Sequence, residues 1–208
     1  QTDSNYFDSF TAIGSKLIFR ARTSNERNLW ITDGTTAGTF ELMNVNDGDD
    51  IVSEVVTNGS AFAFRTNNTS VGSELFYSDG TVAGTRILDL NEGSTSSSPS
   101  NLRFFGNKVA FNARLASYST SGDDEWMYSD GTIAGTRRLD PDPNDNVYRL
   151  ATTPVVLGNK IYYIATDPEH GAELWKSDGT IAGTTLVKDV RPGTSGSEIN
   201  VLYVIGSK

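Results

Sequence analysis

One eight-residue phrase occurs four times in this chain, and its spacing limits the possible folds. The copies occupy residues 32–39, 78–85, 129–136 and 177–184, and each reads Ser/Thr-Asp-Gly-Thr-x-Ala-Gly-Thr. Successive aspartates of the phrase lie 46, 51 and 48 residues apart. A period near 48 residues is typical of one propeller blade. The sequence therefore predicts a repeat protein made of four similar units.

The phrase has the composition of a tight turn between two strands. An aspartate carboxylate accepts hydrogen bonds from backbone N–H groups a few residues further on, and glycine adopts the positive φ that such turns require. A catalytic site would normally occur once, whereas this phrase occurs in every unit. We therefore predict a structural role for the residues Asp33, Gly34, Asp79, Gly80, Asp130, Gly131, Asp178 and Gly179.

Each unit also contains four short apolar segments typical of strands. Expected first strands are 10–13, 52–56, 102–105 and 155–157, and each precedes a tight turn containing Gly or Asn. Expected second strands are 17–21, 61–65, 109–113 and 161–165. Third strands end just before the repeated phrase, and fourth strands are expected at 40–45, 86–90, 137–139 and 185–190. Long polar links follow at 46–50, 91–100, 140–146 and 191–197.

This pattern predicts an all-β fold, a β-propeller of four-stranded antiparallel blades with four blades in this chain. A β-sandwich would not repeat its turn chemistry at a fixed period, and the coils of a β-solenoid are usually shorter than about 30 residues. We expect a single domain over residues 1–208. Its units cover approximately 8–50, 51–98, 99–147 and 148–196, and residues 197–208 form a fifth copy of the first strand.

Composition narrows the possible partners. The 208 residues carry a net charge of −9, and the sequence pI is about 4.6. Nucleic acids and anionic membranes are bound mainly through Lys and Arg, so neither is an expected partner. The chain contains no cysteine, which excludes disulfides and thiolate metal sites. It begins with neither Met nor a signal peptide, and we expect it to be a processed or excised piece.

The run Glu173-Leu174-Trp175-Lys176-Ser177-Asp178-Gly179-Thr180 resembles the Glu-Leu-Trp-x-x-Asp-Gly-Thr repeat of large secreted and surface-exposed bacterial proteins. The resemblance extends over all four units. It implies a propeller-like module in an exported or surface protein, and the family has no catalytic residues to transfer. This sequence departs from the repeat in three units: Asn28 replaces the Glu, Phe76 replaces the Trp, and Trp126 is shifted by one position.

No candidate for catalysis is well supported by the sequence. His170 is the only histidine, and no nucleophile motif lies near it. The adjacent carboxylates Asp49–Asp50 and Asp123–Asp124 generally point apart, whereas a glycosidase needs two carboxyl groups held across a pocket. We therefore expect a protein that is not an enzyme, with a propeller glycoside hydrolase as the alternative. We expect no cofactor, although the acidic links 46–50 and 140–146 could hold calcium.

Two features could form a binding surface. Trp30, Phe76 and Trp175 share one position in the repeat, where they would form either the core between blades or a set of sugar-stacking platforms. The loops between second and third strands, expected at 22–28, 66–74, 114–125 and 166–173, differ between units. Variable loops on a constant frame are typical of a binding face. The candidate ligand-binding residues are Tyr118, Asp123, Asp124, Glu169 and His170.

These observations predict a non-catalytic binding or structural module, located extracellularly or at the cell surface. Its expected partners are itself or other surface proteins, and glycans if the module is lectin-like. The end of the chain suggests self-assembly, because residues 204–208 repeat residues 12–16 at a distance of 192 residues. Two first strands would then compete for one position in a closed ring. We expect either a longer array or association through the terminal strands, as an eight-bladed ring or a fibre, with simple closure as the alternative.

Overall fold

The computed structural model describes residues 11–23, 26–45, 50–51, 55–116, 125–139 and 153–206. This part of the chain is built from antiparallel strands arranged in four sheets. None of its segments is a helix long and apolar enough to cross a membrane.

Each sheet contains the strands of one repeat unit, in chain order, and we call the sheets blades 1 to 4. Blade 1 consists of β1 (Thr11–Ile13), β2 (Lys16–Thr23), β3 (Glu26–Thr32) and β4 (Phe40–Val45). Blade 2 consists of β5 (Asp50–Ile51), β6 (Val56–Thr57), β7 (Phe62–Asn68), β8 (Gly72–Ser78) and β9 (Arg86–Leu88), and both β5 and β6 pair with β7. Blade 3 consists of β10 (Ser100–Phe105), β11 (Lys108–Ala113), β12 (Glu125–Ser129) and β13 (Arg137–Arg138). Blade 4 consists of β14 (Val155–Leu157), β15 (Lys160–Asp167), β16 (Gly171–Ser177) and β17 (Thr185–Lys188).

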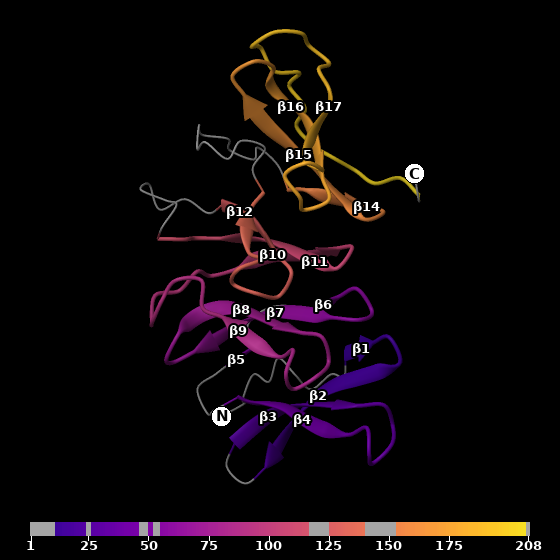
Figure 1. Ribbon diagram of the computed structural model, residues 1–208, viewed down its shortest axis with the longest axis vertical. Helices are drawn as coiled ribbons and strands as arrows, with labels where there is room; N and C mark the ends of the chain where they lie inside the picture. The colour runs from indigo at the N-terminus through magenta and orange to yellow at the C-terminus, as the bar shows by residue number, and fades with distance from the viewer. Residues whose placement is uncertain are drawn as a thin grey trace, which may run out of the picture.

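The four blades stack face to face along the long axis of the molecule, with blade 1 at one end and blade 4 at the other (Figure 1). Hairpins connect the strands within a blade, and a link connects the fourth strand of one blade to the first strand of the next. This is the arrangement of a β-propeller, and it confirms the predicted all-β fold of four-stranded blades. The two terminal blades do not meet (Figure 1).

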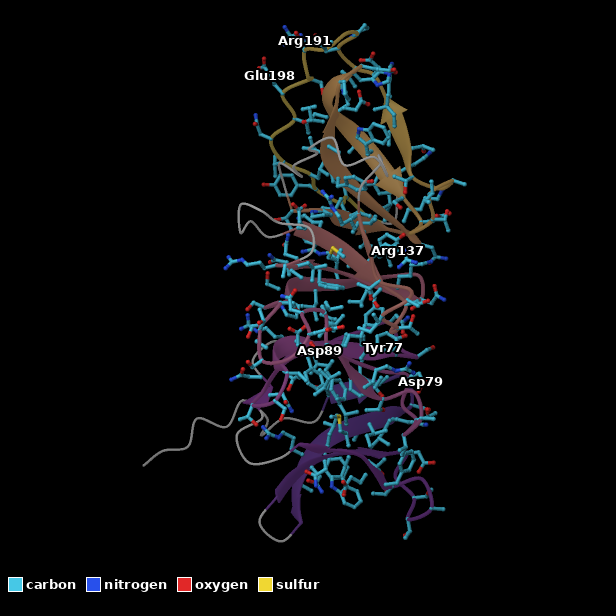
Figure 2. All side chains as sticks on the ribbon, turned by 60° about the vertical axis from the view of Figure 1, so that its left-hand side comes forward. Tyr77, Asp79, Asp89, Arg137, Arg191 and Glu198 are labelled. Atoms are coloured by element: carbon cyan, nitrogen blue, oxygen red, sulfur yellow. The ribbon has the colours of Figure 1, made fainter. Side chains whose placement is uncertain are left out.

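The core lies between the blades and repeats from one interface to the next. At the first interface Phe62, Phe64 and Phe76 of blade 2 pack on side chains of blade 1. The rings of Phe64 and Phe76 stack with their centroids 4.2 Å apart. Equivalent clusters join blade 2 to blade 3 and blade 3 to blade 4, and Figure 2 shows side chains filling the spaces between the sheets.

Each blade therefore has two apolar faces. We call the face turned toward the blade before it the preceding face, and the opposite one the following face. Strand alternation separates the two sets, because successive side chains point to opposite sides of a sheet. In blade 2, Phe62, Phe64 and Phe76 belong to the preceding face, whereas Ala63, Leu75 and Leu88 belong to the following face.

The second and third strands pair in the same register in every blade. The second and third strands place one pair of residues directly opposite each other on the preceding face: Phe19 and Trp30, Phe64 and Phe76, Phe111 and Met127, and Tyr163 and Trp175. The predicted second strands were correct in position but too short. In blades 2 and 4 the strands of this hairpin continue to Asn68 and Asp167.

The long loops expected at 66–74 and 166–173 are therefore wrong in extent. Only residues 69–71 and 168–170 form the turns between paired strands. The side chains of Asn68 and Asp167 explain this difference, because each accepts hydrogen bonds from two backbone N–H groups of its turn. Such side-chain capping closes a short turn without a longer loop.

The fifth copy of the first strand, expected within 197–208, is not a strand up to residue 206. Most of its apolar side chains are exposed, with Tyr203 80% and Ile205 83% accessible. A first strand in the other units is held by a neighbouring second strand, as β10 is by β11. Residues 201–205 pair with no strand among the described residues, which explains why a similar sequence does not form the same element here.

The first glycine of the repeated turn packs against the blade before it. A Cβ atom at Gly131 would lie 2.3 Å from the ring of Tyr77, and one at Gly80 would lie 3.3 Å from Ile31. Gly34, in the first blade, has no described atom within 4 Å of that position. All three glycines have positive φ, between 80 and 90°. At Gly80 and Gly131, glycine therefore both adopts the positive φ of the turn and leaves room for a side chain of the neighbouring blade.

This difference between glycines predicts unequal effects of substitution. Gly34→Ala should lower the free energy of unfolding by about 1–3 kcal/mol, because alanine is strained at positive φ. Gly131→Ala should lower it by about 1–3 kcal/mol more, because the added methyl group overlaps the Tyr77 ring. Urea unfolding of both variants and the parent measures the difference. Equal effects would contradict the inter-blade role of Gly131.

Candidate functional site

The stack has two edges with different chemistry. The repeated turns lie along one edge, which we call the turn edge. The described links, 91–100 and 191–197, and the described second-to-third-strand turns, 69–71 and 168–170, lie along the opposite edge, which we call the loop face. Figure 2 shows Asp79 and Arg137 toward the turn edge and Arg191 and Glu198 toward the loop face.

The polar groups of the turn edge bind one another. In the first copy, Asp33 Oδ1 accepts hydrogen bonds from the Thr35 backbone N–H at 2.9 Å and from its hydroxyl at 2.7 Å. The Thr35 hydroxyl oxygen accepts the Gly38 N–H at 3.0 Å, and the Thr39 hydroxyl donates to the Thr35 carbonyl at 2.6 Å. The same four bonds occur in the other three copies.

The aspartate of the turn also explains why the seventh residue of the phrase is glycine. A Cβ atom at Gly38, Gly84, Gly135 or Gly183 would lie 2.0 Å from a carboxylate oxygen of the aspartate five residues earlier. Hydrogen bonds from Thr35 and Thr180 lower the pKa of Asp33 and Asp178 below the usual range, so both carboxylates are ionised at neutral pH. These carboxylates bind their own turns, which is the arrangement expected of a structural element.

On the loop face, Asp167 and His170 form a close pair at the tip of the β15–β16 hairpin. His170 Nδ1 lies 2.8 Å from Asp167 Oδ2 and 3.0 Å from Oδ1. The hydrogen bond to Asp167 raises the pKa of His170. Burial alone would raise the pKa of Asp167, but the hydrogen bonds from His170 and Glu169 outweigh it and lower this pKa.

The blade 2 hairpin shows what this pair does. Asn68 occupies the position of Asp167, and its Oδ1 accepts the N–H groups of Ser70 and Val71 at 2.8 and 3.1 Å. Val71 occupies the position of His170 and has no titratable group. The turn therefore closes in the same way without a histidine. His170 adds a side-chain hydrogen bond to a turn that the residue at position 167 already closes.

A buried carboxylate holds the link of blade 2 against its hairpin. Glu74 is fully buried, and its carboxylate accepts the Ser97 N–H at 2.6 Å, the Ser97 hydroxyl at 2.5 Å and the Leu90 N–H at 3.1 Å. Burial raises the pKa of Glu74. One side chain thus holds two parts of the link, since Leu90 directly precedes it and Ser97 lies in its second half.

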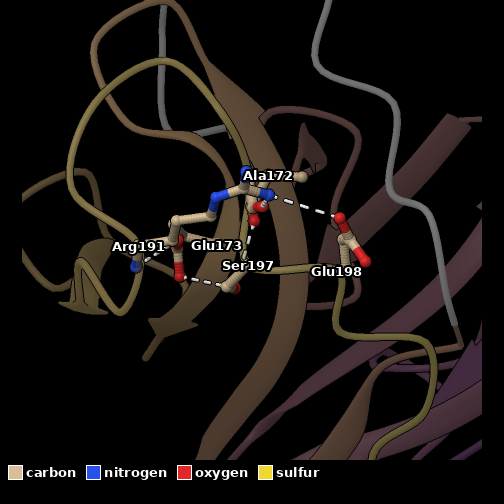
Figure 3. A network of polar contacts seen from close by, with 6 residues as sticks. Ala172, Glu173, Arg191, Ser197 and Glu198 are labelled. Carbon is tan, nitrogen blue, oxygen red and sulfur yellow. Dashed lines mark hydrogen bonds and ion pairs between the residues drawn. The ribbon is translucent and has the colours of Figure 1, made fainter.

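Blade 4 repeats this clamp (Figure 3). Glu173 is also fully buried, and it accepts the Ser197 hydroxyl at 2.8 Å and the Arg191 N–H at 3.2 Å. The Arg191 guanidinium extends outward and donates to Glu198 Oε1 at 3.2 Å. Gly72 and Gly171 lie beneath the two links, where a Cβ atom would approach link atoms to 2.8 and 2.5 Å.

The link of blade 2 also binds the next blade. Asn91 Nδ2 donates to the Arg114 carbonyl at 2.7 Å, and Asn91 Oδ1 accepts the Ala116 N–H at 2.8 Å. The Arg114 N–H donates to the Ser97 carbonyl at 2.8 Å. Arg114 and Ala116 follow the end of β11, so this link joins the loop faces of blades 2 and 3.

The structure places only part of the predicted ligand set. Glu169 and His170 lie together at the tip of the β15–β16 hairpin on the loop face. Tyr118, Asp123 and Asp124 lie outside the described residues, as do residues 46–49 and 140–146 of the links proposed for calcium. Within the described residues, no group of three or more His, Asp or Glu side chains has the geometry of a metal site.

Two of the three aromatic residues at the shared repeat position face a neighbouring blade. Phe76 is buried at the first interface, and Trp175 packs against the cluster between blades 3 and 4. Trp30 stacks on Phe19, with ring centroids 6.4 Å apart. Phe76 and Trp175 are therefore inter-blade core rather than exposed platforms.

The glutamate clamps were not predicted from the sequence. Their signal is a glutamate just before the Leu-Phe or Leu-Trp pair, with a serine 23 or 24 residues later. The glutamate is part of the repeat that the sequence resembles. Its serine partner, however, is separated from it in sequence by the repeated turn, the fourth strand and most of the link.

Replacing Glu74 tests the clamp. Glu74→Gln should lower the free energy of unfolding by about 1–3 kcal/mol, because one carboxylate oxygen becomes an NH₂ group facing backbone or hydroxyl donors. Glu92→Gln is the matched control, since Glu92 lies exposed on the same link. Thermal and urea unfolding should show a loss only for Glu74→Gln, and similar stability for both variants would contradict the clamp.

The pair at the hairpin tip predicts a pH effect that NMR can follow. Because the pKa of His170 is raised on folding, the stability that it contributes is complete below its ordinary pKa of 6.5 and is lost as the pH rises through the folded value. Asp167→Asn should return the pKa of His170 toward 6.5 while Asn closes the turn as Asn68 does. An unchanged histidine titration in this variant would contradict the assignment.

The chain matches no model of a known protein family, and it matches none of the curated proteins. Similar solved structures include the β-propeller domain of the Trilobed protease from Pyrococcus furiosus, with 13% identity, a TM-score of 0.45, and coverage of 88% of this chain and 55% of that chain. They also include TolB from Acinetobacter baumannii, with 13% identity, a TM-score of 0.38, and coverage of 86% and 43%.

Pyrococcus horikoshii acylaminoacyl peptidase is similar at 12% identity and a TM-score of 0.45, with coverage of 86% of this chain and 27% of that chain. The chain thus spans about a quarter to a half of the length of these proteins. Their activities are properties of those proteins, and the propeller fold of this chain follows from its own sheets.

Proposed function

We propose that this chain is a non-catalytic binding or structural module of an extracellular or cell-surface protein, and that its loop face is the surface that a partner contacts. The observation that carries the proposal is the contrast between the two edges. The polar groups of all four repeated turns bind within the turn, whereas the two described hairpin tips of the loop face, those of blades 2 and 4, present different side chains.

The tips differ in chemistry while keeping the same backbone frame. Blade 2 presents Thr69, Ser70 and Val71, whereas blade 4 presents Pro168, Glu169 and His170. Both turns contain three residues, and both are closed by the preceding Asn or Asp. A constant frame with different exposed side chains is typical of recognition surfaces.

Two features support a role without catalysis. Asp167 caps its own turn and also binds His170, so the carboxylate of this pair is engaged by groups of the turn. The repeated aspartates are likewise held by hydrogen bonds in their own turns. The extracellular or surface location is supported by the resemblance of the repeated phrase to that of secreted bacterial proteins.

A turn graft tests the loop face. Replacing residues 167–170 by the blade 2 turn Asn-Thr-Ser-Val preserves the length and the capping residue, so the graft should melt close to the parent. If blade 4 contributes to recognition, binding on a glycan array or to candidate surface proteins should fall at least tenfold in the graft. Ile181→Val, which copies the blade 2 turn on the opposite edge, is the control and should bind like the parent.

Three results would overturn parts of this proposal. Binding that the graft leaves unchanged would move the recognition surface away from this hairpin. Turnover of aryl glycosides, esters or peptides that is abolished by replacing one carboxylate would establish an enzyme. Antibody labelling that requires permeabilised cells would contradict the surface location. Glycan binding lost in the graft would favour the lectin-like form of the module, and no binding or turnover at all would favour the structural form.

A further inference from the structure

The described residues include five Asp-Gly or Asn-Gly steps, the sequences most prone to spontaneous rearrangement because glycine has no Cβ to hinder it. The steps are Asp33-Gly34, Asn58-Gly59, Asp79-Gly80, Asp130-Gly131 and Asp178-Gly179. In the rearrangement the glycine nitrogen loses its proton and attacks the side-chain Cγ of the residue before it. The new C–N bond closes a succinimide ring, and water leaves from Asp or ammonia from Asn. Water then opens the ring, and one of the two openings leaves the main chain running through the side-chain carboxyl, as isoaspartate.

A side-chain hydroxyl holds the glycine N–H at each of these steps. In the first copy of the repeated phrase, the Gly34 N–H donates to Thr32 Oγ1 at 2.9 Å. In the other three copies a serine hydroxyl accepts the glycine N–H at 2.9 to 3.0 Å, from Ser78, Ser129 and Ser177. The hydroxyl always belongs to the residue directly before the aspartate. The nitrogen that would attack is therefore already engaged as a hydrogen-bond donor.

The Asn-Gly step lies in a different turn and has the same contact. The Gly59 N–H donates to Thr57 Oγ1 at 2.9 Å, in the turn between β6 and β7. The corresponding turns of the other blades read Gly-Ser or Gly-Asn followed by Lys, so they contain no Asn-Gly step. The residue before each of those turns is apolar: Ile13, Phe105 or Leu157. Among these four hairpins, the hydroxyl thus occurs only in the one that contains the reactive step.

The side chain that would be attacked is held as well. Asp33 Oδ1 accepts two hydrogen bonds from Thr35, at 2.9 and 2.7 Å, and Asn58 Oδ1 accepts the Ser60 N–H at 2.9 Å. These bonds fix the side chain toward the residues that follow and keep Cγ from turning onto the glycine nitrogen. The threonine hydroxyl of the turn also lowers the pKa of Asp33 and Asp178. An ionised carboxylate resists the attack, because it has no hydroxyl group to release as water.

We propose that the Ser or Thr before each Asp-Gly or Asn-Gly step protects that step from isoaspartate formation by keeping the glycine N–H in a hydrogen bond. Burial does not give this protection, because Asp33, Asp79 and Asp130 are exposed to water. Isoaspartate would insert one methylene into the main chain of a turn that joins two paired strands, and would displace the glycine from the neighbouring blade. This role of the hydroxyl does not depend on the ligand or the location of the module.

Removing one hydroxyl tests the proposal at one step, while the other steps of the same molecule report any general loosening. Ser78→Ala removes the acceptor of the Gly80 N–H. Isoaspartate at Asp79 should then form about fivefold faster, the factor expected when one ordinary hydrogen bond no longer opposes the attack. Ser78→Thr copies the hydroxyl of Thr32 and should keep the parent rate. Folded samples are held at neutral pH below their melting temperatures, and isoaspartyl peptides are quantified after digestion by chromatography with electron-transfer fragmentation.

A further variant separates protection from stability. Glu74→Gln is expected to weaken the same blade, but it leaves the contact between Ser78 and Gly80 intact. Isoaspartate at Asp79 should therefore form in this variant at the parent rate. Circular dichroism and thermal unfolding confirm that each variant is folded at the temperature of the incubation.

Two other hydroxyls extend the test to different turns. Thr57→Val should raise the rate of ammonia loss from Asn58 about fivefold, for the same reason. This reaction is read as a gain in mass of the peptide, because a carboxyl replaces an amide. If Ser78→Ala does not fold, since Ser78 is fully buried, Thr32→Val takes its place in the exposed turn of blade 1, with Thr32→Ser as its control.

Equal rates of isoaspartate formation at Asp79 in Ser78→Ala and in the parent would overturn the proposal. A rise at every step together in Ser78→Ala would overturn it as well, as would an equal rise at Asp79 in Glu74→Gln. In both of these cases the rearrangement would follow unfolding rather than the loss of one hydrogen bond. None of these results bears on the loop-face graft, which is read through ligand binding, so the two proposals can fail separately.

Discussion

The structure depends on apolar contact between neighbouring sheets. A four-stranded sheet with apolar side chains on both sides cannot bury either side by itself, and neighbouring blades here cover the sides that face each other. The contact uses the same strand positions each time, with Phe64, Phe111 and Tyr163 fully or almost fully buried in successive interfaces. Burial stabilises such contacts by about 25 cal/mol per Å² of apolar surface. The free energy of unfolding of such an array is approximately the sum of a term for each blade and a term for each interface between neighbours.

Polar interactions hold the turns and links at the two edges of this packed array. At the turn edge, the Asp carboxylate and two Thr hydroxyls satisfy the turn, and glycine allows the next blade to approach. At the loop face, Glu74 and Glu173 hold the links in place from within the fold. Burying a carboxylate is unfavourable unless its oxygens are hydrogen-bonded, and the serine and backbone donors of the links provide these bonds. The two edges are thus stabilised by unlike chemistry.

Local features of the fold could be predicted from the sequence, whereas features that join distant segments could not. The repeated phrase and the Gly turns identify strands, their order and the blade size, because each is a short-range property. The Glu74–Ser97 clamp joins residues 23 positions apart, and only the folded link brings them together. The hairpin turns were expected to be longer loops because the capping by Asn68 and Asp167 is not visible in hydrophobic periodicity. Of the predicted ligand residues, Glu169 and His170 are adjacent in sequence, so their proximity needed no long-range information.

The link between blades 2 and 3 has a consequence for recognition. Its atoms are hydrogen-bonded to Glu74 below, to the hairpin beside it and to Arg114 and Ala116 of the next blade. A segment without strand structure is thereby held in one conformation on the variable surface. A partner that binds there would meet a surface already ordered and would lose little conformational entropy in the encounter. Selectivity on such a surface arises from matching a fixed shape, and changes in its side chains can alter the partner without altering the frame.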